Sequence, residues 1–61
     1  MDANGLVFMF LKSSRVCMTK KRVASKMLFS KTKTSLALRY LRKVKKVAIF
    51  RSNNKVYWGV V

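Results

Sequence analysis

Acidic and catalytic side chains are nearly absent from this sequence. Its 61 residues contain no histidine, no proline, two glycines, one cysteine and a single acid, Asp2. Zinc sites, and catalysis by histidine or by paired carboxylates, need residues that the chain does not have. Cys17 has no histidine to act as its base, and a sole cysteine cannot form an internal disulfide. We therefore predict neither an enzyme nor a cofactor, metal ion or small-molecule substrate, and we interpret Cys17 as a buried structural thiol.

Long apolar runs are also missing. The longest, from Gly5 to Leu11, is far shorter than the ~20 residues that span a bilayer. A secretory signal would carry positive charge before its apolar run, whereas the first charge here is Asp2. The acid-poor composition also fits an organellar transit peptide, but the aromatic C-terminal segment is typical of folded structure. Together with the single cysteine, these features predict an intracellular location, in the cytoplasm or nucleoid.

Positive charge is what the chain has in abundance. Fifteen lysines and arginines give a formal net charge of +14. The hydrophobic fraction of 51% argues against disorder, so we expect one small folded domain over residues 1–61. Self-repulsion at this charge density opposes folding, and a nearby polyanion relieves it. Nucleic acid is the first expectation for that polyanion, and an anionic membrane surface is the second.

Two helices joined by a tight turn are predicted in the centre of the chain. Thr19 suits the N-cap of a helix that runs to about Leu28, and Ser30 or Thr32 can cap a second helix over about 31–46. At about 100° per residue, one side of the second helix can pack. That side carries Thr34, Ala37, Leu38, Leu41, Val44 and Lys45. The opposite side is basic and carries Thr32, Ser35, Leu36, Arg39, Arg42, Lys43 and Lys46.

The N-terminal segment, from Met1 to Arg15, is interpreted as another helix, capped by Asp2 or Asn4. Periodicity alone does not separate helix from buried strand here, because the apolar residues are continuous. Part of this apolar surface would face water in a monomer, unless it packs on the C-terminal segment or on a second copy of the chain. Residues 16–18 can form a short strand.

Residues 47–61 predict a β-hairpin, because they are rich in β-branched and aromatic side chains. Asn53-Asn54 suits a two-residue turn, since asparagine tolerates positive φ. Pairing outward from this turn puts Phe50 opposite Tyr57 on one face. The other face is expected to cover the helices, and it carries Val47, Ile49, Trp58 and Val60.

The resulting order of elements resembles that of the winged helix-turn-helix superfamily. Ala24, Met27 and Phe29-Ser30 lie where its motif has a small residue, an apolar residue and an apolar–serine pair. Leu28 lies where the family often has glycine, and leucine resists the positive φ of that turn.

The second central helix also matches the spacing of the family's recognition helix, at Thr34, Leu38 and Leu41, with Thr34 a polar departure. The resemblance implies an α+β fold, with three helices followed by a C-terminal β-hairpin, the wing.

This resemblance implies a sequence-specific DNA-binding protein, a transcription regulator that prefers double-stranded DNA to RNA. The helix around 31–46 would enter the major groove, where Ser35 and Arg39 would contact base edges. The hairpin over 47–61 would contact the backbone, and a homodimer would form through Leu6–Leu11. The expected phosphate contacts are Lys20, Lys21, Arg22, Lys31, Thr32, Lys33, Arg42, Lys43, Lys46, Arg51 and Lys55.

Two other functions fit the composition. A structural RNA-binding protein of the ribosomal type would use scattered cations and could stack Phe50 and Tyr57 on bases. Trp58 could stack as well, although core packing suits it better. A membrane-active or partner-inhibiting basic peptide is the other hypothesis, but it has no need of a hairpin. The order of elements favours DNA over both.

Overall fold

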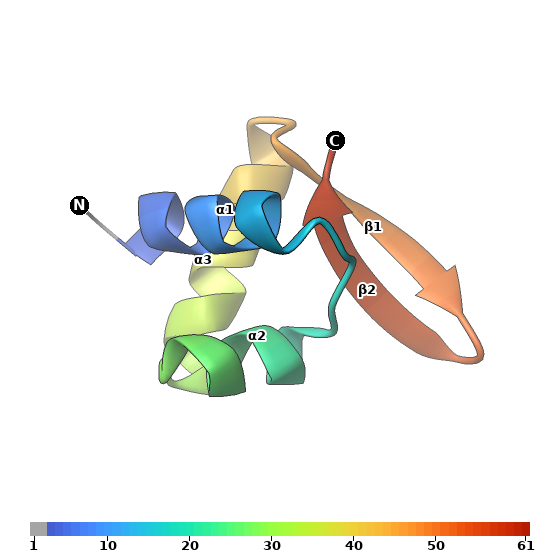
Figure 1. Ribbon diagram of the computed structural model, residues 1–61, viewed down its shortest axis with the longest axis horizontal. Helices are drawn as coiled ribbons and strands as arrows, with labels where there is room; N and C mark the ends of the chain where they lie inside the picture. The colour runs from blue at the N-terminus through green and yellow to red at the C-terminus, as the bar shows by residue number, and fades with distance from the viewer. Residues whose placement is uncertain (1–2) are drawn as a thin grey trace.

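Three helices precede a two-stranded antiparallel hairpin in the computed structural model, which describes residues 3–61 (Figure 1). The elements are α1 (Ala3–Ser14), α2 (Lys20–Met27), α3 (Lys31–Lys43), β1 (Val47–Ser52) and β2 (Lys55–Val60). This arrangement confirms the expected three helices and wing. Of the two suggested caps of α1, Asp2 lies outside the described residues and Asn4 lies inside the helix. None of the described helices has the length and apolar character needed to cross a membrane.

Side-chain caps set the starts of α2 and α3. Thr19 Oγ1 accepts a hydrogen bond from the backbone N–H of Arg22 at 3.3 Å. Ser30 Oγ accepts one from the backbone N–H of Lys33 at 3.1 Å, so Ser30 rather than Thr32 is the second cap. Each bond satisfies a backbone donor that the first helical turn leaves free.

The turn between α2 and α3 is built on a leucine in the left-handed region. Leu28 has φ 59° and ψ 33°. The N–H of Phe29 donates to the carbonyl of Ala24 at 3.0 Å, and that of Leu28 to Ser25 at 3.3 Å. This pair of bonds is the Schellman motif, which usually has glycine in this position. The expected tight turn therefore forms despite the leucine, whose side chain is 91% exposed.

The end of α3 differs from the prediction. The helix stops at Lys43 rather than Lys46, and Lys45 takes a positive φ of 65°. The N–H of Lys46 donates to the carbonyl of Leu41 at 2.9 Å, and that of Lys45 to Arg42 at 3.0 Å, so a second Schellman motif ends the helix. Val44 and Lys45 were expected on the packed side of the helix. Both are exposed instead, because the chain leaves the helix before reaching them.

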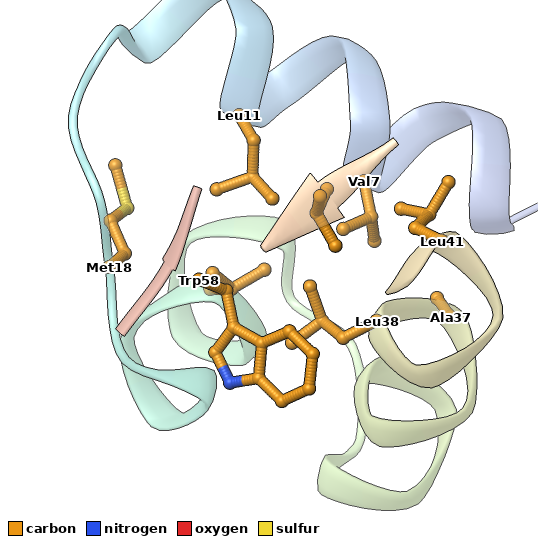
Figure 2. Close-up of a cluster of buried hydrophobic side chains, with 9 residues drawn as sticks. Val7, Leu11, Met18, Ala37, Leu38, Leu41 and Trp58 are labelled. Carbon is orange, nitrogen blue, oxygen red and sulfur yellow. The ribbon is translucent and has the colours of Figure 1, made fainter. Parts of the chain in front are cut away.

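The core lies where α1, α3 and the wing meet, and Figure 2 shows its side chains converging from these elements. Trp58 is 6% exposed within it, so its expected core role is confirmed. Thr34 is fully buried, and its Oγ1 has no hydrogen-bond partner among the described residues. The buried apolar cluster comprises Val7, Leu11, Met18, Val23, Ala37, Leu38, Leu41, Val47 and Trp58.

The hairpin has the register that the sequence predicts. Phe50 pairs with Tyr57, and the ladder runs from Val47 opposite Val60 to Ser52 opposite Lys55. Asn53 and Asn54 have φ values of 51° and 62°, as a type I′ turn requires.

Only one residue of the short strand expected at 16–18 pairs with the hairpin. Met18 and Trp58 exchange backbone hydrogen bonds of 3.0 and 2.7 Å. This bridge accompanies the burial of Met18 and ties the segment before α2 to β2.

Cys17 is exposed, so its interpretation as a buried thiol is wrong. Successive side chains of an extended segment point to opposite sides, and burial of Met18 turns Cys17 outward. Its thiol lies against the backbone of Gly59, where an added Cβ would come within 2.6 Å of the sulfur. Gly59 is therefore needed for close approach rather than for a positive φ.

Candidate nucleic-acid interface

The packed side of α3 determines which of its side chains face solvent. Thr34, Ala37, Leu38 and Leu41 are buried against α1, α2 and the wing. The side chains away from the core are exposed or half-buried, and they are mainly cationic or hydroxyl-bearing. They are Lys31, Thr32, Lys33, Ser35, Leu36, Arg39, Tyr40, Arg42 and Lys43.

Both predicted base-contacting residues line one shallow, open depression beside the start of α2. We call it the α3 hollow, and it is lined by Lys20, Lys31, Thr32, Ser35, Leu36 and Arg39. Lys20 Nζ donates a hydrogen bond to Ser35 Oγ at 3.3 Å across it. Ser35 is half-buried and Arg39 is exposed. The structure thus brings Ser35 and Arg39 together with three of the predicted phosphate contacts.

Further cations continue from the α3 hollow along the same helix. Arg39 also lines a shallow depression with Arg42 and Lys43, one turn further on. The sole acidic residue of the chain is Asp2, so no carboxylate side chain among residues 3–61 neutralises this surface. Unpaired cations along a helix face favour contact with a polyanion.

A second basic surface lies between α2 and the hairpin. This α2–wing groove is lined by Lys21, Arg22, Lys26, Lys55 and Tyr57, among others. Lys21, Arg22 and Lys55 were predicted as phosphate contacts, whereas Lys26 was missed. Its position one helical turn after Arg22 is the signal that could have identified it. Arg51 lines a depression at the hairpin turn, together with Lys55.

Two of the predicted phosphate contacts, Lys33 and Lys46, lie over aromatic rings. Lys33 Nζ is 4.6 Å from the centre of the Phe29 ring. Lys46 Nζ is 5.2 Å from that of Phe8, on α1. Both distances suit a cation–π contact, so neither side chain is oriented into the α3 hollow.

Comparison with known proteins identifies the architecture. No protein-family model and no curated protein sequence matches the chain. A solved structure of a mutant of ZitR from Lactococcus lactis superposes with a TM-score of 0.82 at 21% sequence identity. The match covers 95% of this chain and 40% of the ZitR chain.

The chain has a winged helix-turn-helix fold. In this fold α2, the Leu28 turn and α3 form the helix-turn-helix, and the β1–β2 hairpin is the wing. The α3 hollow therefore lies on the second helix of the helix-turn-helix. The α2–wing groove lies between the helix-turn-helix and the wing. At 21% identity the likeness establishes the fold and assigns no ligand to this chain.

Proposed function

We propose that this protein binds double-stranded DNA and acts as a transcription regulator, with α3 in the major groove. The observation that carries the proposal is the α3 hollow. There the buried side of the recognition helix leaves Ser35 and Arg39 facing outward among cations. A helix fits the major groove of B-DNA, and an arginine can pair bidentately with guanine there. The winged helix-turn-helix fold that the chain shares with ZitR supports this proposal.

The surrounding cations would contact phosphates. Lys31 and Thr32 lie in the first turn of α3, whose free backbone N–H groups also favour an anion. Lys21, Arg22 and Lys55 would bind backbone from the α2–wing groove, and Arg51 from the wing. The remaining contacts of this proposal are Lys20, Arg42 and Lys43. Lys33 and Lys46 would join them with the ammonium N–H groups that do not face their aromatic rings.

A homodimer through α1 remains part of the proposal, on a smaller surface than the sequence indicated. Val7 and Leu11 are already used by the core. Leu6 and Met9 are 39% and 52% exposed, and half-buried Phe10 lies nearby on the helix. A twofold assembly would present two α3 helices to two half-sites, as dimeric helix-turn-helix proteins do. Such a regulator would work inside the cell.

Removing the Arg39 guanidinium tests whether this group contacts a base or a phosphate. Arg39→Ala should lower discrimination between a selected site and random duplex more than it lowers binding to random duplex. Lys12→Ala is the matched control, because it removes one exposed charge from α1. Equal losses on both duplexes would make Arg39 a phosphate contact.

The dependence of DNA affinity on salt concentration tests whether the wing contacts phosphates. Lys55→Ala should weaken binding to all duplexes alike and reduce the slope of log K against log salt by about one. An unchanged slope would remove the wing from the interface.

Structural RNA binding is the second candidate, because the outer face of the wing carries an aromatic pair. Phe50 is 48% exposed and its cross-strand partner Tyr57 is half-buried, so bases could stack there. Fluorescence anisotropy with random duplex DNA, a structured RNA and anionic vesicles, each over a salt series, separates the candidates. Tight duplex binding by a chain that is folded without ligand supports the DNA proposal. Far tighter RNA binding by a poorly folded chain would replace it.

A further inference from the structure

The proposed recognition helix, α3, has no amide or carboxylate side chain. Residues 31–43 contain no asparagine, glutamine, aspartate or glutamate. The chain has no glutamine or glutamate at all, and its three asparagines lie elsewhere. Asn4 is on α1, while Asn53 and Asn54 form the turn of the wing. This composition limits which bases α3 can recognise, provided that it enters the major groove as proposed above.

Each base presents a different edge in the major groove. Asparagine and glutamine pair bidentately with adenine, and carboxylates accept a hydrogen bond from the amino group of cytosine. Arginine and lysine donate to O6 and N7 of guanine, and apolar side chains contact the methyl group of thymine. Since α3 lacks both amides and carboxylates, it has no side chain of the types that select adenine or cytosine.

The hydrogen bond between Lys20 and Ser35 further limits which base edges the α3 hollow can bind. A serine hydroxyl can donate or accept, so alone it tolerates any base edge. Here Ser35 Oγ accepts from the Lys20 ammonium at 3.3 Å, which leaves the hydroxyl proton free to donate. The ammonium has further N–H groups, and the Arg39 guanidinium on the same hollow only donates. Apart from the Thr32 hydroxyl and the second lone pair of Ser35 Oγ, an amino group of adenine or cytosine would meet donors here, whereas guanine presents two acceptors.

Leu36 supplies an apolar contact beside these donors. It lines the α3 hollow and is 61% exposed, although neighbouring α3 residues bury their apolar side chains. Covering this side chain with the methyl group of thymine would remove apolar surface from water.

From these observations we infer that the DNA target presents guanine and thymine edges to the α3 hollow. Arg39 and the Ser35 hydroxyl contact guanine, and Leu36 contacts a thymine methyl group. Lys20 acts on the base as a positioning residue, since it holds Ser35 as a hydrogen-bond donor, and its other N–H groups can make the phosphate contact proposed above. Adenine and cytosine edges are disfavoured at the same positions.

The first experiment is selection from a random duplex library with the full wild-type chain, followed by base-analogue scanning of the enriched site. Replacing a contacted guanine by 7-deazaguanine removes the N7 acceptor, and replacing thymine by deoxyuridine removes the methyl group. We expect at least one 7-deazaguanine position to weaken wild-type binding about tenfold, as loss of a bidentate base contact does. The same analogue should have little further effect on Arg39→Ala. Deoxyuridine should weaken wild-type binding several-fold but leave Leu36→Ala unchanged.

Two variants test the role of Lys20. Lys20→Gln places an amide, which also accepts, beside Ser35, so adenine should become tolerated where wild type requires guanine. Lys12→Ala should bind with the wild-type base preference, and circular dichroism should show every variant folded. An enriched site whose contacts depend on adenine or cytosine edges would overturn the inference while leaving DNA binding intact. Equal binding of all duplexes would overturn this inference and the proposed function together.

Discussion

The leucine at the α2–α3 turn should be a site where stability rises on mutation. Leu28 has a positive φ of 59°, and a left-handed conformation costs an L-residue about 1–2 kcal/mol. Its side chain is 91% exposed, so Leu28→Gly would remove almost no buried apolar surface. Glycine offsets part of this relief of backbone strain, by about 0.5–1 kcal/mol, because it makes the unfolded chain more flexible. We expect a net stabilisation of about 0.5–1 kcal/mol.

Thermal unfolding followed by circular dichroism measures this effect. For a domain of this size, the expected gain raises Tm by roughly 2–8 °C. Leu28→Ala is the control, since it deletes the same exposed side chain but retains a Cβ at positive φ. Its Tm should stay near that of wild type. A lower Tm for Leu28→Gly, or an equal rise for Leu28→Ala, would refute the argument from backbone strain.

Three further substitutions test the packing. Thr34→Val should raise the free energy of unfolding by about 1 kcal/mol in urea denaturation, because it removes a buried hydroxyl without a partner; a decrease would mean that the hydroxyl is satisfied. Trp58→Ala should cost about 3–5 kcal/mol and unfold much of the population, whereas a folded variant that had lost only nucleic-acid binding would make Trp58 a stacking residue. Gly59→Ala should cost about 1 kcal/mol, because its Cβ would come within 2.6 Å of the sulfur of Cys17, an exposed side chain that would have to rotate away. Adding Cys17→Ala should recover part of that loss, and strict additivity of the two changes would contradict this cause.

Most of the fold could be predicted from the sequence, because short local signals determine where its turns, strands and helices begin. Asn53-Asn54 determined the position of the turn, and alternation along the two strands then determined the register. Thr19 and Ser30 marked the starts of two helices because short hydroxyl side chains cap them well. These features depend only on residues that are close together in the sequence.

Features that depend on residues far apart in the sequence were harder to predict. Cys17 was expected inside because cysteine is often buried, but pairing of Met18 with Trp58 turned it outward. The Schellman motif at Lys45 shortened α3, and no glycine marked it. The Lys20–Ser35 bond joins two helices, so helical periodicity within either one could not reveal it.

Amide chemical-shift mapping of the folded chain during titration with a duplex DNA shows which surface of the protein contacts the DNA. We predict that the largest shifts fall on the N-terminal half of α3, the start of α2 and the wing turn. Signals on the outer side of α1 should move little at low DNA occupancy. Shifts concentrated on α1, or on the outer wing face at Phe50 and Tyr57 with α3 unaffected, would contradict recognition through α3.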